Sequence, residues 1–169
     1  KASIVQGMLG RELAVTFPER RPPVDASVAP ILVVENVSTA AGVQSASLEV
    51  RPGEIVGLLG LVGSGRSEIA RAIAGADPIT AGRILFQGAE CRRWNTRAAI
   101  EAGVVMVPED RHAQGLVLER SVKENISLAF LSRFARLGVV SPRRERENAQ
   151  QFAEALNMRP PRINLDIGG

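Results

Sequence analysis

The fold of this chain is decided by one stretch of its sequence, Gly60-Leu61-Val62-Gly63-Ser64-Gly65-Arg66-Ser67. The residues before it, 54–60, form a nearly continuous apolar run that is typical of a buried central strand. Residues 66–74 follow with apolar side chains at helical spacing, and Gly75 is placed to end that helix. A buried strand, a glycine-rich turn and a helix in this order predict an α/β architecture.

The spacing of the glycines matches the pattern G-x-x-x-x-G-K-[S/T] at every position but one. In such a loop the backbone turns its N–H groups around phosphate oxygens, and the N-terminus of the helix adds a favourable dipole. The Ser67 hydroxyl would contact a magnesium ion. The alternative is a glycine-rich turn that binds no ligand. The residues expected to bind phosphate are Gly60, Leu61, Val62, Gly63, Ser64, Gly65, Arg66, Ser67 and Glu68.

The exception to the pattern is Arg66, which stands where the motif has lysine. Lysine is a compact point charge, whereas arginine presents a broad planar fork, so the exchange is not conservative in a tight phosphate site. We therefore expect phosphate binding to be weakened or re-posed and not abolished.

The composition fits a soluble globular domain. The chain has 169 residues, of which 45% are hydrophobic and 23% charged, enough for one sizeable core. Aromatic residues make up only 4%, which argues against recognition of single-stranded nucleic acid by stacking. The net charge of +3 does not form one basic stripe, because Arg143, Arg144 and Arg146 alternate with Glu145 and Glu147. No nucleic-acid partner is expected.

The single Cys91 excludes an internal disulfide and a cysteine metal cluster, and it fits a reducing cytoplasm. No apolar run reaches the length of a membrane span, and no signal peptide opens the chain. We expect a cytoplasmic protein without direct membrane insertion. If it serves a membrane, it does so by docking onto another subunit.

The rest of the pattern predicts an α/β portion followed by a helical portion. The proline-rich residues 17–23 are typical of a linker, and a fresh domain opens at Pro30. Thr96 is a candidate helix cap and Gly103 a candidate stop, while Ser141 and Pro142 begin the last helix as cap and first residue. Strands are expected over residues 31–37, 45–50, 54–60, 83–86 and 104–107, and helices over 66–74, 96–102, 122–134 and 142–156.

Segments on both sides of the octet resemble the ATP-binding cassettes of the ABC transporter family. They are Arg51-Pro52-Gly53-Glu54-Ile55-Val56-Gly57, Gly75-Ala76-Asp77-Pro78 and Gly82-Arg83-Ile84. Other segments resemble the second cassette of the tandem subunits of monosaccharide importers (ribose, galactose or xylose type). They are Val107-Pro108-Glu109-Asp110-Arg111, Gly115-Leu116-Val117-Leu118 and Ser121-Val122-Lys123-Glu124-Asn125-Ile126. Finally, Met8-Leu9-Gly10-Arg11-Glu12-Leu13 is similar to the tail of a first cassette.

This resemblance implies a P-loop NTPase fold in which residues 1–29 are the tail of a preceding cassette and a linker. Residues 30–169 would be the N-terminal portion of a nucleotide-binding domain, with a core over 30–110 and the start of a helical subdomain over 111–169. ATP and Mg²⁺ are the implied cofactors, and Ser67 and Glu109 the implied metal ligands. The implied partners are transmembrane permease subunits and the first cassette of the same or a second subunit, at the inner face of the plasma membrane.

The sequence also departs from the family pattern. Glu109 stands where the cassettes usually carry a glutamine, and its carboxylate adds negative charge beside phosphate, unless it is merely a solvated loop residue. The aromatic residue expected to stack on adenine is missing from residues 39–42. The resemblance puts the signature loop, the acidic strand and the switch histidine beyond Gly169, so no catalytic residue is expected here and the chain alone should be inactive. His112 is interpreted as a surface or packing residue.

The expected function is the ATP-binding component of an ABC-type sugar importer, with this cassette a degenerate site. One alternative is a non-catalytic P-loop regulatory or binding module, which Arg66 and Glu109 favour; another is a P-loop small-molecule kinase. Residues 111–125 would contact the permease, or simply begin the helical subdomain with Val117 and Val122 packed inside. Trp94 is expected to be a partly buried packing residue.

Overall fold

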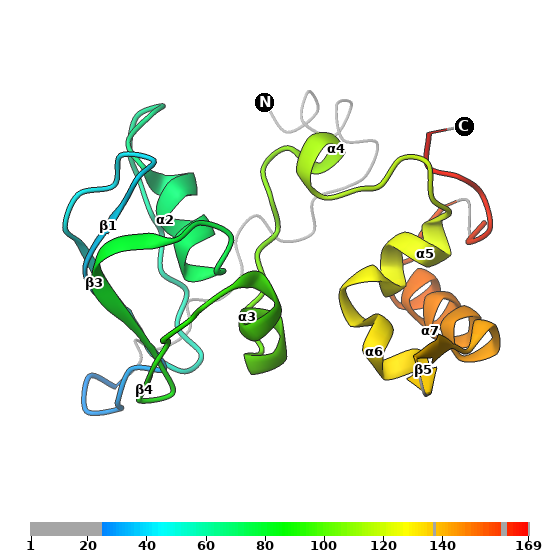
Figure 1. Ribbon diagram of the computed structural model, residues 1–169, viewed down its shortest axis with the longest axis horizontal. Coiled ribbons are helices and arrows are strands. Elements are labelled where there is room, and N and C mark those ends of the chain that lie inside the picture. Colours follow the sequence, from blue (N-terminus) through cyan, green and yellow to red (C-terminus); the bar gives the residue numbers. More distant parts are fainter. Residues whose placement is uncertain (1–24, 137, 160–161, 169) are drawn as a thin grey trace, which may run out of the picture.

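The computed structural model describes residues 25–136, 138–159 and 162–168. The expected tail of a preceding cassette and linker, residues 1–29, lies outside them except for residues 25–29. Figure 1 shows two groups of elements. One is a sheet with helices α2 (Arg66–Ile73) and α3 (Thr96–Ala102), and the other is a cluster of helices around α7 (Pro142–Ala155). The connecting chain carries α4 (Arg111–Gln114).

The sheet is antiparallel throughout the described residues. Its strands are β1 (Leu32–Thr39), β2 (Ala46–Val50), β3 (Ile79–Phe86) and β4 (Ala89–Glu90), in the order β2-β1-β3-β4. Three of these strands were predicted, β1 from branched aliphatic side chains and β2 from the alternation of polar and apolar residues, although β3 begins earlier than the expected residue 83. The register places Val34 opposite Leu48 on one side and Ile84 on the other.

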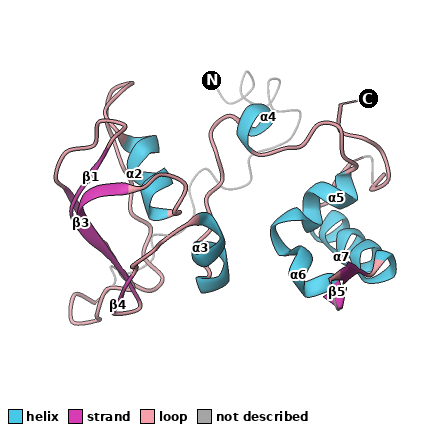
Figure 2. Ribbon diagram, in the orientation of Figure 1, coloured by secondary structure: helices cyan, strands magenta, loops and turns pink. Residues whose placement is uncertain are grey.

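Helix α2 packs onto this sheet and completes its core. Ile69 and Ala72 are the buried residues of the helix, and the side of β1 that carries Val34 and Val37 is buried as well. These two residues are three apart, and they share one side because a β-bulge between Val34 and Val37, with Asn36 at φ 48°, interrupts the alternation of side chains along the strand. The helix is drawn against the sheet in Figure 2, and its burial there fixes the position of the loop that precedes it. The core cluster consists of Val34, Val37, Val43, Ile69 and Ile84.

Helix α3 is joined to the end of α2 by hydrogen bonds of its own N-terminal segment. The Trp94 indole N–H donates to the Ile73 carbonyl at 2.7 Å, which confirms Trp94 as a packing residue. The prediction that Thr96 caps α3 was wrong. Asn95 has the extended backbone of a cap, and its side chain accepts from the Ala98 N–H at 3.0 Å. Gly103 ends the helix with φ 97°, as expected.

Two of the expected strands are wrong. Residues 54–60 and 104–107 belong to no strand, and most of their apolar side chains are exposed; Ile55 is 92% exposed, Leu59 96% and Val107 82%. An apolar run becomes a buried strand only where neighbouring strands pair with it and other layers cover both of its faces. In the part of the chain that the structure describes, β1 to β4 pair with one another and none pairs with either run.

The helix expected over residues 122–134 is divided into three pieces. They are α5 (Val122–Ser127), the 3₁₀ turn η1 (Leu128–Phe130) and α6 (Leu131–Phe134). The break falls at Phe130, whose φ of −130° is not helical. A short hairpin of β5 (Ala135–Arg136) and β6 (Val139–Val140) then leads to α7. Pro142 is the first residue of α7, as expected. Ser141 was expected to cap the helix, and it occupies the cap position but makes no side-chain cap hydrogen bond.

Helices α5 and α7 are held together by a buried polar contact and a small apolar cluster. Glu145 on α7 is 7% exposed. Its carboxylate accepts from the Ser127 hydroxyl at 2.6 Å and pairs with the Lys123 ammonium at 3.3 Å. Because these groups satisfy one another, the burial of the charge is offset. Beside them, Ala149 and Ala153 pack with Ile163, Ile126 and Met158.

The last described residues run beside the start of α5. The Val122 N–H donates to the Leu165 carbonyl at 2.9 Å, and the Lys123 N–H to the Ile163 carbonyl at 2.8 Å. In the other direction, the Gly168 N–H donates to the Leu118 carbonyl at 3.0 Å. The segment therefore clasps both α5 and the loop before it. Among the described helices, none has the length and apolar character needed to cross a membrane.

We expect Ile84→Ala to lower the free energy of unfolding by about 2–5 kcal/mol, because it leaves a cavity between β3 and α2. The matched control is Ile55→Ala, which removes the same atoms from an exposed position and should change stability by less than about 0.5 kcal/mol. Urea unfolding followed by circular dichroism measures both. An equal loss in the two variants would contradict the exposed position of residues 54–60.

Glu145→Ala is expected to destabilise the helical group by about 2–4 kcal/mol, because it leaves the largely buried Lys123 ammonium without its partner and removes the hydrogen bond that joins α7 to Ser127. Glu147→Ala is the control on the same helix. Glu147 pairs with Arg143 at the surface, at 2.8 Å, and such a pair contributes less than about 1 kcal/mol. Hydrogen exchange of peptides from α5 and α7 distinguishes this local effect from unfolding of the sheet.

Candidate functional site

The glycine-rich loop reaches α2 through residues whose backbone conformation favours glycine. Residues 61–64 form a turn in which the Ser64 N–H donates to the Leu61 carbonyl at 3.1 Å. Gly63 and Gly65 have φ of 81° and 85°, in the left-handed region that other residues rarely adopt. The backbone conformation at these two positions therefore favours the glycines of the motif. The loop itself is largely exposed.

Among the described residues, no side chain caps the N-terminus of α2, so its first amides can receive an acceptor from outside the chain. Gly65 occupies the cap position and has no side chain to accept from the amides of the first turn. The first hydrogen bond of the helix runs from the Ile69 N–H to the Gly65 carbonyl, at 2.9 Å. An anion at this end would receive the amides of the first turn together with the helix dipole. Glu68 lies in the same turn and adds a competing negative charge.

Beside this helix end lies a pocket of about 750 Å³ that brings together two distant parts of the sequence. From α2 come Ser67, Glu68 and Arg71, and from the segment that leads into α4 comes Glu109. The two metal ligands expected from the sequence, Ser67 and Glu109, thus line one pocket. Residues 60–66, the rest of the expected phosphate site, are not among its lining residues. The other lining residues are Met106, Asp110, Arg111, His112 and Gln114.

Some charges of the pocket are already engaged by other groups. Arg71 binds Asp77 through two hydrogen bonds of 2.7 Å. That contact lowers the pKa of Asp77 and raises the pKa of Arg71. Asp110 caps α4 by accepting from the Ala113 N–H at 3.0 Å. In the part of the chain that the structure describes, no hydrogen bond or ion pair engages the side-chain oxygen atoms of Ser67, Glu68 and Glu109, which line the same pocket.

This donor set fits Mg²⁺, which prefers oxygen ligands and takes one or two carboxylates together with the phosphates of a substrate. Within the described residues, no three side chains of histidine, cysteine, aspartate or glutamate form a closed metal cage. A metal at Ser67 and Glu109 would therefore need further oxygen atoms from phosphate and water. Such an arrangement suits a metal that arrives with a nucleotide.

Several residues of the pocket were not predicted from the sequence. His112 is exposed on α4, as a surface residue should be, yet it also lines the pocket. Arg111 and Gln114 reach it from the same short helix, and Met106 from one of the two exposed apolar runs. In the sequence, these residues are marked only by their nearness to Glu109, since Asp110 caps α4 directly after it.

The chain belongs to the ABC transporter family, whose family model matches residues 43–164. This match confirms the family resemblance and, together with the solved structures below, the α/β P-loop fold. The matched segment includes the glycine-rich loop, Glu109 and most of the helical group. The small-molecule kinase alternative is thereby disfavoured.

The similar curated proteins are named as sugar import components. The chain is 39% identical over 166 residues to a ribose import ATP-binding protein of Rhodococcus jostii, covering 98% of this chain and 32% of that protein. It is 42% identical over 156 residues to another such protein of Streptomyces coelicolor, covering 92% and 30%. A putative ribose/galactose/methyl galactoside import ATP-binding protein of Rhizobium etli is 42% identical, with 95% and 30% covered. The chain spans about a third of the length of these relatives.

Solved structures show the same fold at lower identity. A nucleotide-free ATP-binding cassette from an ABC transporter superposes with a TM-score of 0.60 at 21% identity, covering 83% of this chain and 58% of that one. The ADP conformation of another ATP-binding cassette of an ABC transporter gives a TM-score of 0.56 at 20% identity, with 83% and 59% covered. At this identity the likeness concerns the fold alone.

Proposed function

We propose that the chain is part of the ATP-binding component of an ABC-type sugar importer and that it holds one nucleotide site of that component. The observation that carries the proposal is the pocket at the N-terminus of α2, which Ser67 and Glu109 enter from separate segments. The names of the relatives, which are import ATP-binding proteins for ribose or related sugars, support the class of substrate.

In this proposal the backbone amides of residues 60–68 hold the phosphates of ATP, and the Ser67 hydroxyl and the Glu109 carboxylate contact Mg²⁺. Bound there, Mg²⁺ would neutralise phosphate charge. The uncapped end of α2 supports the role of the amides, since it offers several donors aimed the same way. Glu68, in the first turn of α2, would face the metal side of the phosphates, where its negative charge is tolerated.

The site is proposed to be degenerate, binding nucleotide but turning it over poorly. Arg66 carries a planar fork where a compact ammonium is usual, and Glu109 adds a charge where an amide is usual. The same two residues favour a second candidate function, a P-loop module that senses nucleotide without hydrolysing it. Both candidates require nucleotide binding, and turnover separates them.

The remaining parts of the chain are assigned by the same proposal. Residues 1–29 would be the tail of a preceding cassette and a linker, and residues 30–169 the front of a nucleotide-binding domain. Residues 111–125 would contact a transmembrane permease subunit, which holds the protein at the cytoplasmic face of the plasma membrane. Another cassette would complete the nucleotide site. The exposure of α4 supports such a contact surface, because its side chains are not used in packing.

Titration with a fluorescent ATP analogue, with and without Mg²⁺, tests nucleotide binding directly. Arg66→Ala should weaken the affinity by about tenfold or more, because a charge-assisted contact to phosphate is lost. Arg97→Ala is the control; Arg97 is an exposed arginine on α3 that pairs with Glu101 at 3.0 Å, so the affinity should stay within about twofold. Absence of saturable binding in both this chain and a chain of the relatives' length would overturn the proposal.

Arg66→Lys, placed in a chain of the relatives' length, tests the degenerate site. A compact ammonium between the terminal phosphates should raise the rate of ATP turnover by about tenfold, in line with one restored charge-assisted hydrogen bond. Steady-state release of phosphate is the measurement. Unchanged turnover and unchanged nucleotide occupancy would argue that Arg66 is not what limits the site.

A further inference from the structure

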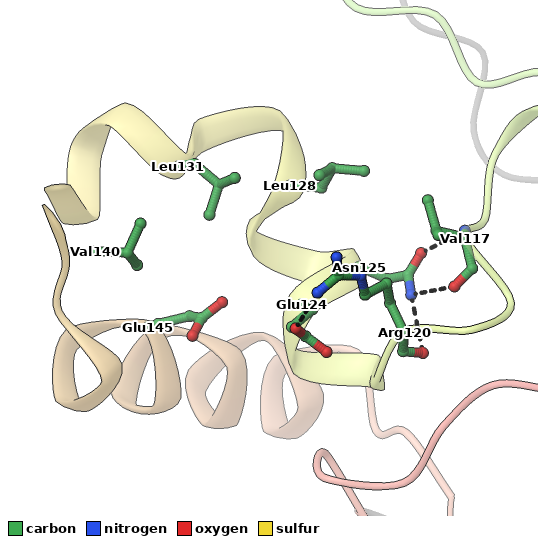
Figure 3. Close-up of a pocket in the computed structure, with 8 residues that line it drawn as sticks. All are labelled: Val117, Arg120, Glu124, Asn125, Leu128, Leu131, Val140 and Glu145. Carbon is green, nitrogen blue, oxygen red and sulfur yellow. Dashed lines mark hydrogen bonds and ion pairs between the residues drawn. The ribbon is translucent and has the colours of Figure 1, made fainter. Parts of the chain in front are cut away.

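Asn125 has a hydrogen-bonding arrangement that the proposed function does not use. It is the fourth residue of α5 and half-buried, and its side chain turns back onto the loop of residues 117–121 (Figure 3). Its Oδ1 accepts from the Val117 N–H at 2.8 Å, and its Nδ2 donates to the Val117 carbonyl at 3.0 Å. The same Nδ2 donates to the carbonyls of Arg120 and Ser121 at 3.3 and 3.1 Å. One carboxamide thus closes the loop.

Glu124 braces the same loop from the neighbouring position. Its carboxylate accepts from the Ser121 N–H at 3.0 Å, and the Ser121 hydroxyl accepts from the Glu124 N–H at 3.3 Å. The two bonds together make a capping box. It also pairs with the Arg120 guanidinium at 3.0 Å. These bonds, led by that from the Ser121 backbone, lower the pKa of Glu124 to about 2, so the brace is ionised at neutral pH.

The loop lies between the candidate pocket and the helical group. On its upstream side, residues 109–112 and 114 line the pocket together with α2. On its downstream side, the Leu118 carbonyl accepts from the Gly168 N–H at 3.0 Å, and the Arg120 carbonyl from the Ile167 N–H at 3.2 Å. The loop is therefore the direct chain connection through which a shift of the pocket-lining segment can reach α5 and residues 163–168.

We propose that Asn125 is a positioning residue that fastens the 117–121 loop to α5. A displacement of residues 109–114 on nucleotide binding then reaches α5 and residues 163–168 as the movement of one unit. The inference rests on the proposed function, because it requires nucleotide in the pocket. It adds to that function the element, the 117–121 loop fastened by Asn125, that carries the response to nucleotide from the pocket to α5 and residues 163–168.

The chemistry of the contact requires asparagine. Val117 presents both its N–H and its carbonyl to the side chain, so the partner must accept and donate at once. Aspartate has the same shape but turns a charged oxygen toward three carbonyls in place of the donor. Serine is too short to span the loop. Both variants keep a small polar residue on the helix, so the loop can be released without removing an apolar core residue.

The experiment is hydrogen exchange on a chain of the relatives' length, with and without a slowly hydrolysed ATP analogue and Mg²⁺. In Asn125→Asp and Asn125→Ser, exchange of residues 117–121 without nucleotide should rise by about tenfold or more, because the closing bonds are lost. The affinity for nucleotide should stay within about twofold of the unmodified chain, since Asn125 does not line that pocket. The nucleotide-dependent change in α5 and residues 163–168 should disappear.

The matched control is Asn164→Asp, an exposed asparagine in the clasping segment, which should retain the nucleotide-dependent change. Retention of that change in both Asn125 variants would overturn the inference. Faster exchange throughout the chain, β1 and β3 included, would overturn it too, because Asn125 would then serve stability alone. Nucleotide binding that leaves residues 109–121 unaffected in the unmodified chain would also overturn it, with the nucleotide site intact. Absence of binding would remove the proposed function and this inference together.

Discussion

The burial of Ile69 between α2 and the sheet is the contact on which the rest of this structure depends. Ile69 packs with Val34 and Ile84, and this packing holds α2 against β1 and β3. Because α2 is only eight residues long, its orientation is set by that contact and not by its own helical propensity. The direction in which its open N-terminus points, and hence the place of Ser67 in the pocket, follows from the same packing.

Much of the sheet group was predictable because its signals are local. Branched aliphatic residues identified β1, and the turn at residues 51–53 formed as expected, with the Glu54 N–H donating to the Arg51 carbonyl at 3.1 Å. The exposed runs 54–60 and 104–107 show the limit of such reasoning. Their composition is that of buried strands, but pairing depends on which other strands are at hand, and that information is not local to the run.

The candidate site divides in the same way. The spacing of glycines pointed to Ser67, and the family resemblance pointed to Glu109; the structure brings both to one pocket. His112 could not be assigned to that pocket, since nothing in its neighbours distinguishes a pocket-lining histidine from a solvated one. Asn125 was equally hidden, because a polar residue in the second turn of a helix usually faces water. The capping box of Ser121 and Glu124, by contrast, is readable from the sequence pattern alone.

The two exposed apolar runs also bear on how such a chain behaves while it is being made. The antiparallel sheet is built from near neighbours in sequence, except for the pairing of β1 with β3, so it can form early. The sheet does not bury residues 54–60 and 104–107, and Ile55, Leu59 and Val107 remain exposed to solvent beside it. Exposed segments of this kind bind one another between chains. These two runs are therefore the places in the described chain at which association with other chains, and with it loss of solubility, should begin.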